Sequence, residues 1–402
     1  MRFDLLQTLA ISGMTLFAGY GMRRLVPGLA RLNIPPAVLG GLLVACVFLL
    51  LRSQGLSTPQ FDTSLQGPLL IAFFTTVGFS ASVALLRAGG PQVLLLLAIT
   101  SVFAIVQNLV GIALAMGFGL PPLFGVLTGS VTLTGGPATG LAFAPQFEQA
   151  GVTGAGAIAI ATAMAGIVLG GLVGGPVATV LIEKFRLRRA GSVPPEAAIV
   201  STAGRATATL PVDETAVAFI AIKTVVVVLA AMGIGSGISA AITAIGITLP
   251  GYIGGMLTAA AIRYLDDRTG WIGLSHRSIS ILGAVALSLF LAMALMTLDL
   301  TQLAGFALPL LVILCVQSIL AAAICLWPVF QLMGRDYDAA VMTGGFLGFI
   351  LGTSANAMAV MRALADSYGE APRAFLVAPL VGAFFLDFTN ALIITFFLNL
   401  LR

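Results

Sequence analysis

The stretch Val126-Leu-Thr-Gly-Ser130, followed by Thr134-Gly-Gly-Pro-Ala-Thr-Gly140, decides the fold of this chain because a similar stretch occurs about 215 residues later. The later copy reads Val341-Met-Thr-Gly-Gly345, followed by Leu351-Gly-Thr-Ser-Ala-Asn356. Nearly the same offset relates Leu39-Gly-Gly-Leu-Leu43 to Ile253-Gly-Gly-Met-Leu257. Apolar segments broken by glycine at corresponding places in two halves are typical of membrane transporters.

The composition places the chain in a bilayer. With 59% apolar and 8% charged residues, it has too few polar residues to cover a soluble globule. Ten apolar stretches are long enough to cross a membrane, five in each half. They lie at 4–22, 34–51, 68–86, 91–118, 155–182, 215–235, 247–262, 279–298, 304–330 and 374–400. We therefore predict an all-α polytopic membrane protein with ten transmembrane helices.

Two further apolar segments, 121–147 and 337–365, are interrupted by Gly, Pro and Thr. We interpret each as a re-entrant hairpin, buried in protein or facing a water-filled cavity. An odd number of spans per half reverses the orientation of the second half, so the halves 1–183 and 213–402 are predicted to be inverted repeats. The hydrophilic segment 184–212 is predicted to link them.

The distribution of basic residues predicts the orientation. If the N-terminus lies outside, fifteen of the nineteen basic residues fall on the cytoplasmic side. Both termini are then outside and the 184–212 linker is cytoplasmic. The positive-inside rule accounts for the basic residues, and these residues form no cluster interleaved with aromatics. The net charge of +4 therefore does not indicate a nucleic-acid partner.

Several chemistries are excluded. The three cysteines, Cys46, Cys315 and Cys325, have no metal-ligand spacing, and His276 is the single histidine, so disulfides, zinc, haem and a catalytic triad are not expected. The hairpins contain no Gly-Lys-Ser/Thr run, which argues against ATP-driven pumping. An enzyme is therefore not expected, and coupling to an ion gradient is the default.

Asp387 is the carboxylate deepest inside a predicted span, and Asn390 lies three residues later on the same helical face. Ionisable groups at membrane depth are expensive and usually functional. A carboxylate beside an amide suits a hard cation that prefers oxygen ligands. The alternative is a hydrogen bond that packs one helix against another.

The hairpins offer the other half of a binding site. Glycines let the backbone approach a ligand, hydroxyls add uncharged polar contacts, and the N-terminus of a broken helix attracts carboxylates. The candidate substrate residues are Ser130, Thr132, Thr134, Gly135, Gly136, Thr139, Gly352, Thr353, Ser354 and Asn356. Tight helix packing is the alternative explanation for such small residues.

Other polar residues within spans admit more than one role. Gln107 and Asn108 form an amide pair whose counterparts in the second half are Gln317 and Ser318, and each pair could bind an ion or join helices. Lys223 could snorkel to the cytoplasmic interface or pair with Asp387. Arg87 and Arg362 are expected to be cytoplasmic anchors, with gripping of an anionic substrate as the alternative.

At these residues the chain resembles the bacterial sodium/glutamate symporter family, nearly from end to end. The stretches that carry the resemblance are Ile34-Pro-Pro-Ala-Val-Leu-Gly-Gly41, Leu86-Arg-Ala-Gly-Gly90, Val106-Gln-Asn108, Thr132 to Gly140, Ser288-Leu-Phe-Leu-Ala-Met-Ala-Leu-Met296, Tyr337-Asp-Ala-Ala340 and Val381-Gly-Ala-Phe-Phe-Leu-Asp387. The resemblance implies a homodimeric secondary transporter of the inner membrane. A core that holds the hairpins would carry the substrate and Na⁺ against a scaffold.

Two stretches depart from the family pattern. Family members commonly read Gly-Gly-His-Gly-Thr-Gly in the first hairpin, where this chain has Pro137 and Ala138 in place of His-Gly, and their Gly-Ala-Thr is Gly352-Thr353-Ser354 here. Proline also removes an N–H donor from the hairpin tip. A different amino acid or a related small carboxylate is therefore an alternative to glutamate.

We expect a Na⁺-coupled symporter of glutamate or a related small carboxylate that works by alternating access. The hairpins would hold the substrate, and Asp387, Asn390 and Asn108 would hold Na⁺, with no organic cofactor. A proton/cation antiporter or a proton-coupled carboxylate permease is the alternative within transport. A membrane scaffold or sensor whose hairpins only pack is the alternative outside it.

Overall fold

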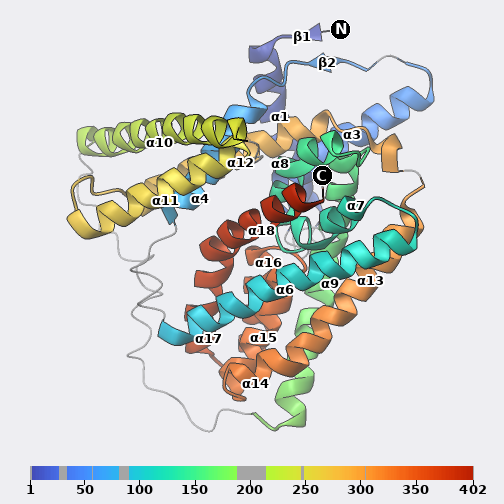
Figure 1. Ribbon diagram of the computed structural model, residues 1–402, viewed down its shortest axis with the longest axis vertical. Coiled ribbons are helices and arrows are strands. Elements are labelled where there is room, and N and C mark those ends of the chain that lie inside the picture. The colour runs from blue at the N-terminus through green and yellow to red at the C-terminus, as the bar shows by residue number, and fades with distance from the viewer. Residues whose placement is uncertain are drawn as a thin grey trace.

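The computed structural model describes residues 2–26, 34–56, 58–80, 90–187, 214–245, 249–303 and 305–401. These ranges are almost entirely helical, as Figure 1 shows. The exceptions to helix include two short parallel strands, β1 (Arg2–Phe3) and β2 (Gln60–Phe61), which pair near the N-terminus. The predicted all-helical class is confirmed. Arg87 and nearly all of the 184–212 linker lie outside the described residues.

The helices pack in two groups. The first, called the three-plus-three group, takes the first three helices of each half, which contact one another extensively. Its members are α1 (Leu5–Leu25), α3 (Pro36–Ser53), α4 (Gln66–Ser80), α10 (Glu214–Ala244), α11 (Gly251–Thr269) and α12 (His276–Met296). In Figure 1, α1 and α10–α12 lie in the upper part of the molecule, and the short helix η4 (Leu300–Leu303) follows α12.

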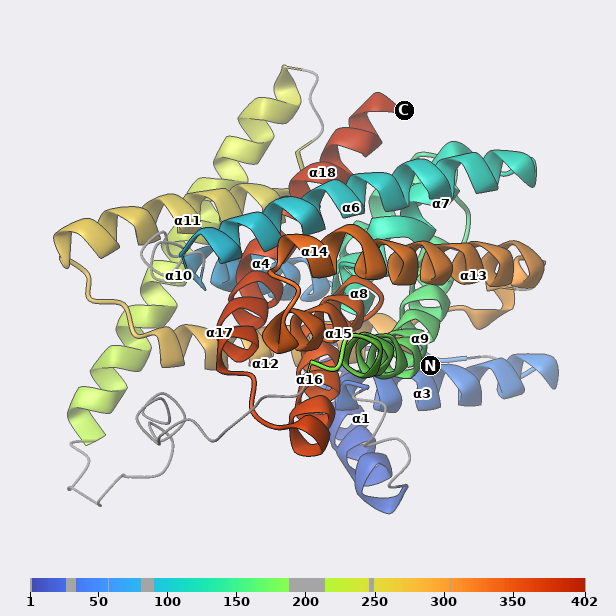
Figure 2. The same ribbon diagram turned by 90° about the horizontal axis from the view of Figure 1, so that it is seen from below.

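The second group, called the hairpin group, contains the rest of each half. From the first half it takes α6 (Gly90–Gly117), α7 (Pro122–Val126), η1 (Leu127–Val131), α8 (Gly136–Gln149) and α9 (Ala155–Lys184). From the second half it takes α13 (Ala307–Ile324), η5 (Cys325–Val329), α14 (Phe330–Leu332), α15 (Tyr337–Ile350), α16 (Ser354–Tyr368), α17 (Pro372–Leu380), η6 (Val381–Phe385) and α18 (Leu386–Leu400). Figures 1 and 2 both show α6 and α13 running side by side.

Seven helices of the described chain are long and apolar enough to cross a membrane. They are Leu5–Leu25, Pro36–Ser53, Gly90–Gly117, Ala155–Lys184, Ala218–Ala244, His276–Met296 and Ala307–Leu332. The predicted spans 68–86, 247–262 and 374–400 also contain helix. However, α4 is described only as far as Ser80, α11 ends in charged residues, and π-helical η6 interrupts the last span. The count of ten remains a prediction.

Glycine lets the helices of the three-plus-three group cross at backbone contact. A Cβ on Gly19 of α1 would lie 1.9 Å from the Pro36 carbonyl oxygen, and one on Gly40 of α3 would lie 1.9 Å from that of Thr15. In the second half, a Cβ on Gly235 of α10 would meet the Gly255 nitrogen at 2.3 Å, and one on Gly254 would meet the Gly235 oxygen at 2.1 Å. The same crossing therefore recurs in both halves.

The halves also interlock through equivalent helices. Gly41 of α3 packs on Leu295 of α12, and Gly255 of α11 packs on Thr75 of α4. In each case the second helix of one half lies against the third helix of the other half. Neither half can therefore complete its packing alone, since a glycine face fits only a partner that comes this close.

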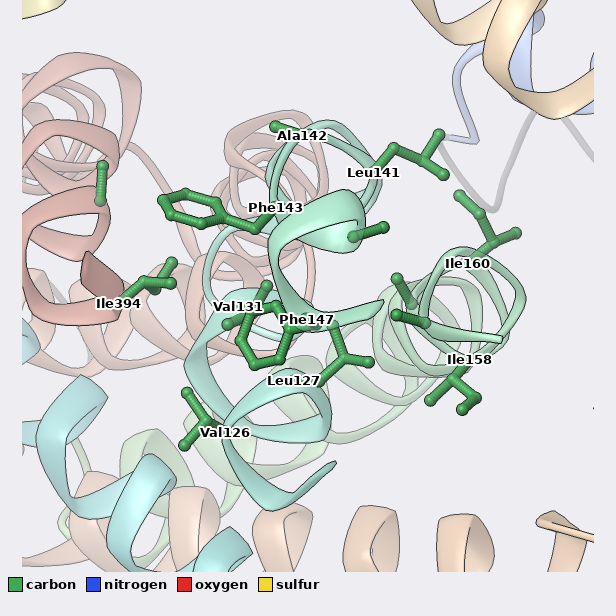
Figure 3. Packing of buried hydrophobic residues seen from close by; sticks show 14 of the residues in the cluster. Val126, Leu127, Val131, Leu141, Ala142, Phe143, Phe147, Ile158, Ile160 and Ile394 are labelled. Atoms are coloured by element: carbon green, nitrogen blue, oxygen red, sulfur yellow. The ribbon is translucent and has the colours of Figure 1, made fainter. Parts of the chain in front are cut away.

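The first arm of each hairpin is buried in protein. In α15 every residue except Asp338 is buried, and all of η1 is buried too, so neither arm has an outward face. Figure 3 shows Phe143 and Phe147 of α8 packed among Leu127 and Val131 of η1 and apolar residues of neighbouring helices. Broken backbone at membrane depth is tolerated only where protein or a cavity surrounds it. The interpretation of both segments as re-entrant hairpins remains a prediction.

Lys223 is held by the turn between α11 and α12. Its Nζ donates to the carbonyls of Ile272 and Gly273 at 2.8 and 3.1 Å. The Asp266 carboxylate accepts hydrogen bonds from three backbone N–H groups of the same turn, at 2.8 to 3.0 Å. Desolvation raises the pKa of the Asp266 carboxyl, but these donors outweigh it and hold that pKa below its usual value. Lys223 therefore anchors the α11–α12 turn, and the alternative pairing with Asp387 is wrong in this structure.

The Gly19 contact predicts the effect of a methyl group there. We expect Gly19→Ala to lower the free energy of unfolding by about 1–3 kcal/mol, because overpacking forces α1 and α3 apart. Thermal unfolding in detergent, followed by tryptophan fluorescence, measures the change. Gly13→Ala on α1 is the matched control, since no atom lies within 4 Å of a Cβ added there. Equal melting temperatures for the two variants would contradict this packing argument.

Candidate functional site

The first hairpin breaks its helix at Gly129. This residue has φ −96° and ψ −125° inside the π-helical segment η1, so the backbone leaves helical geometry there. A Cβ at Gly129 would lie 2.9 Å from Asn108 Oδ1 and 3.0 Å from the Gln107 carbonyl oxygen. Only glycine lets the broken segment approach α6 this closely.

Two amide side chains hold the next residue, Ser130. Asn108 Oδ1 on α6 accepts a hydrogen bond from the Ser130 N–H at 2.9 Å. Asn390 Nδ2 on α18 donates to the Ser130 carbonyl oxygen, also at 2.9 Å. All three residues are buried. The Ser130 N–H therefore finds its side-chain partner on α6. The Ser130 carbonyl oxygen, which also accepts from the Gly135 N–H at 2.9 Å, gains a second partner on α18.

Gln107 joins the tips of the two hairpins. Its Oε1 accepts a hydrogen bond from Thr134 Oγ1 at 2.6 Å, and its Nε2 donates to the Ile350 carbonyl oxygen at 3.1 Å. Thr134 belongs to the first hairpin and Ile350 to the second. Gln317 Nε2 on α13 donates to the Gln107 carbonyl oxygen at 2.7 Å. Of the two roles the sequence left open for Gln107, these contacts show the bridging role.

The tips themselves meet where α8 and α16 begin. Gly136 has a φ of +69°, and a Cβ there would lie 3.5 Å from both the Gly352 oxygen and Thr353 Cγ2. Pro137 lies in the first turn of α8, where its missing N–H costs no helical hydrogen bond. No side chain caps α8, whereas Thr353 Oγ1 caps α16 by accepting from the Asn356 N–H at 3.3 Å. Two positive helix ends therefore converge.

Several predicted substrate residues use their polar atoms within the protein. Thr132 Oγ1 donates to the Leu127 oxygen at 2.8 Å, and Ser354 Oγ donates to the Gly382 oxygen. Asn356 Nδ2 donates to the Ile167 oxygen of α9 at 2.9 Å. Gly135 and Gly352 contribute backbone at the tips, and Thr139 is buried in the first turn of α8. Substrate contacts for this whole set remain predictions.

Other buried polar atoms near the hairpins have no partner among the described residues. They are Asn108 Nδ2, Ser130 Oγ, Asn390 Oδ1, Gln317 Oε1 and Ser318 Oγ. α6, α13 and α18, which carry all but Ser130, each pack against η1. An unsatisfied buried polar atom costs about 1–3 kcal/mol, and such atoms often mark the place of a ligand, ion or water.

Asp387 lies on α18 one helical turn before Asn390. It is partly buried, and within the described ranges it has no hydrogen bond or ion pair. Arg362, the alternative anion contact, is exposed on α16. The described residues contain no group of three or more His, Cys, Asp or Glu that could hold a metal ion. A cation here would depend on amide, hydroxyl, carbonyl and single carboxylate oxygens.

Sequence reasoning found the side chains at this site but missed the carbonyls of Ile350 and Ile167. A backbone carbonyl carries no signal in the residue type, so only the folded chain reveals which carbonyl an amide reaches. The equivalence of Val106-Gln107 and Val316-Gln317 was the one signal that α6 and α13 would both reach this site.

A buried polar site between two broken helices, inside a bundle of apolar helices, defines the class of secondary membrane transporters. A family model described as "Sodium/glutamate symporter" matches residues 1–370. The chain is 38% identical over 400 residues to a sodium/glutamate symporter of Escherichia coli (strain K12), covering 99% of this chain and 98% of that protein. It is 36% identical over 390 residues to one of Haemophilus influenzae (strain ATCC 51907 / DSM 11121 / KW20 / Rd), covering 97% and 96%. The chain belongs to the sodium/glutamate symporter family.

The Gln107 bridge makes a prediction about both tips. Gln107→Leu would leave Thr134 Oγ1 and one Ile350 lone pair without this partner, and we expect a loss of about 1–3 kcal/mol in stability. Amide hydrogen exchange should rise together near 130–136 and 350–353, measured by mass spectrometry. Gln149→Leu, the same change at an exposed position of α8, is the control. Faster exchange at only one tip would show that Gln107 does not join them.

Proposed function

We propose that this protein is a secondary active transporter that couples glutamate uptake to Na⁺ by alternating access. The geometry that best supports this is the meeting of the α8 and α16 N-termini beside buried polar atoms that have no partner. Helix N-termini bind carboxylates, and free amide and hydroxyl oxygens suit Na⁺. The identity of 38% and 36%, over nearly the full length, to proteins named sodium/glutamate symporter supports both glutamate as the substrate and Na⁺ as the ion.

In this proposal the substrate carboxylates bind at the hairpin tips. The donors are the uncapped first turn of α8 and hydroxyls of the predicted set, with Ser130 Oγ free to contribute. Na⁺ binds on the α18 side, where Asp387 and the free Asn390 Oδ1 offer oxygen atoms. The oxygen of Asn108 on α6 already accepts from the Ser130 N–H. Pro137 fits the helical first turn without loss, so its presence is compatible with glutamate as well as a related small carboxylate.

We also propose that the chain comprises two inverted five-span repeats, 1–183 and 213–402. The recurring glycine crossings and the exchange of neighbours between halves support this arrangement. The hairpin group would move as the transport core against the three-plus-three group, because contacts are dense within each group and sparse between them. A homodimer in a bacterial inner membrane, with both termini outside and the 184–212 linker cytoplasmic, belongs to the same proposal.

The function is tested with purified protein in liposomes. We expect labelled L-glutamate to accumulate with an inward Na⁺ gradient, and not with K⁺ or with a proton gradient alone. Proton-driven uptake without Na⁺ would identify a proton-coupled permease, and cation exchange without any organic substrate would identify an antiporter. Absence of Na⁺-driven uptake for glutamate and for related small carboxylates would refute the proposal.

The role of Asp387 can be measured separately. We expect Asp387→Asn to raise the Na⁺ concentration for half-maximal uptake by about tenfold or more, since losing about 1.4 kcal/mol of binding free energy has that effect. Expression and melting temperature without ligand should change little, because Asp387 has no partner within the described chain. Asp366→Asn, at an exposed position of α16, is the matched control. An unchanged Na⁺ profile would remove Asp387 from the ion site.

A further inference from the structure

Each of the two asparagines at Ser130 has one side-chain atom without a partner, and these two atoms are of opposite hydrogen-bonding type. The Ser130 N–H can only donate, so the Asn108 atom bonded to it must be the oxygen. The Ser130 carbonyl can only accept, so the bonded Asn390 atom must be the nitrogen. The backbone of one residue therefore sets the orientation of both amides, and neither can flip without losing its bond.

The atoms left free follow from this orientation. Asn108 retains Nδ2, which can only donate, and Asn390 retains Oδ1, which can only accept. Both atoms are buried without a partner in the described part of the chain, and the side chains are 0% and 1% exposed. Ser130 Oγ is also buried and unpartnered, and it can donate or accept. The two amides bonded to the Ser130 backbone thus leave one free donor and one free acceptor.

The neighbouring charge makes the two sides differ further. Asp387 lies one turn before Asn390 on α18, so the α18 side collects acceptors and negative charge. On α6, Gln107 uses both polar side-chain atoms in the hairpin bridge, which leaves the Asn108 donor as the free side-chain atom of that amide pair. An amide donor stabilises a carboxylate oxygen, and it would repel Na⁺.

We propose that Asn108 binds a carboxylate oxygen of the substrate through Nδ2 and is not a Na⁺ ligand. Asn390 binds the cation through Oδ1. On the α6 side of Ser130, the Asn108 donor favours a substrate carboxylate over the corresponding uncharged amide. This inference rests on the proposed function, because it assigns parts of the same site. It replaces the sequence-based expectation that both asparagines hold Na⁺.

The variant Asn108→Asp tests the polarity directly. Its carboxylate still accepts from the Ser130 N–H, but its free atom becomes an acceptor in place of a donor. We expect the KM for glutamate to rise by about tenfold or more through the loss of one hydrogen bond to a charged group. The KM for one amide analogue, L-glutamine or L-isoglutamine, should rise less, since the NH₂ group of that analogue can donate to the new carboxylate.

Sodium binding is read without substrate, as the rise in melting temperature on adding Na⁺. We expect Asn108→Asp to keep this rise and Asn390→Asp to alter it, while Asn390→Asp keeps the wild-type preference for glutamate over both amides. Asn399→Asp, the same change near the end of α18, is the control. The inference fails if Asn108→Asp abolishes the rise in melting temperature on adding Na⁺. It also fails if the variant raises the KM for glutamate and for both amides by the same factor.

Two further measurements separate the possible failures. If Asn108→Asp does not fold, Asn108→Ser replaces it, and undiminished discrimination between glutamate and its amides would overturn the inference. Wild-type uptake is measured first, because its absence refutes the proposed function. In that case ligand-induced melting shifts for glutamate and the two amides, compared between wild type and variants, still test Asn108.

Discussion

The need to satisfy buried backbone groups without water organises this structure. A membrane protein can break a helix inside its core only if other parts of the chain bond the freed N–H and C=O groups. Here amide side chains from α6 and α18 form hydrogen bonds with the N–H and C=O of Ser130. Gln107 of α6 donates to the Ile350 carbonyl of the second hairpin. The hairpins are therefore tied to the same helices that border the site, so movement of the bundle and geometry of the site are linked.

Close packing at glycine joins the helices of the three-plus-three group. The helices of the three-plus-three group touch backbone to backbone at Gly19, Gly40, Gly235 and Gly254, and each half completes the packing of the other. Lipid supplies little hydrophobic drive between helices, so dispersion contacts at such short distance carry the association. Close glycine contacts also occur in the hairpin group, where a Cβ on Gly125 would lie 2.1 Å from the Gly111 carbonyl oxygen. The hairpin group differs in the polar bonds between its elements and in the unpartnered polar atoms near its hairpins. Under the proposed function, it is the part that handles the ligand.

At the centre, hydrogen bonds to the backbone decide the chemistry of otherwise identical side chains. Asn108 and Asn390 have the same amide, yet Ser130 leaves a donor free on one and an acceptor on the other. Under the proposed function, this arrangement and the converging N-termini of α8 and α16 would give negative and positive charge separate places around a single residue. A zwitterionic or anionic substrate and a cation would then bind side by side, each away from groups of its own sign.

The sequence by itself determined the membrane environment, the helical class, the two segments in which the helix breaks and most of the polar side chains that surround them. These follow from composition, span length and glycine breaks, which are local properties of the chain. Tertiary structure alone decided the partners: Lys223 holds a turn and not Asp387, Gln107 joins hairpin tips through the Ile350 carbonyl, and Asn108 accepts from the Ser130 N–H through its oxygen. Hydrogen-bond partners depend on backbone groups brought together over long sequence distances, and residue types do not encode which carbonyl or N–H will be reached.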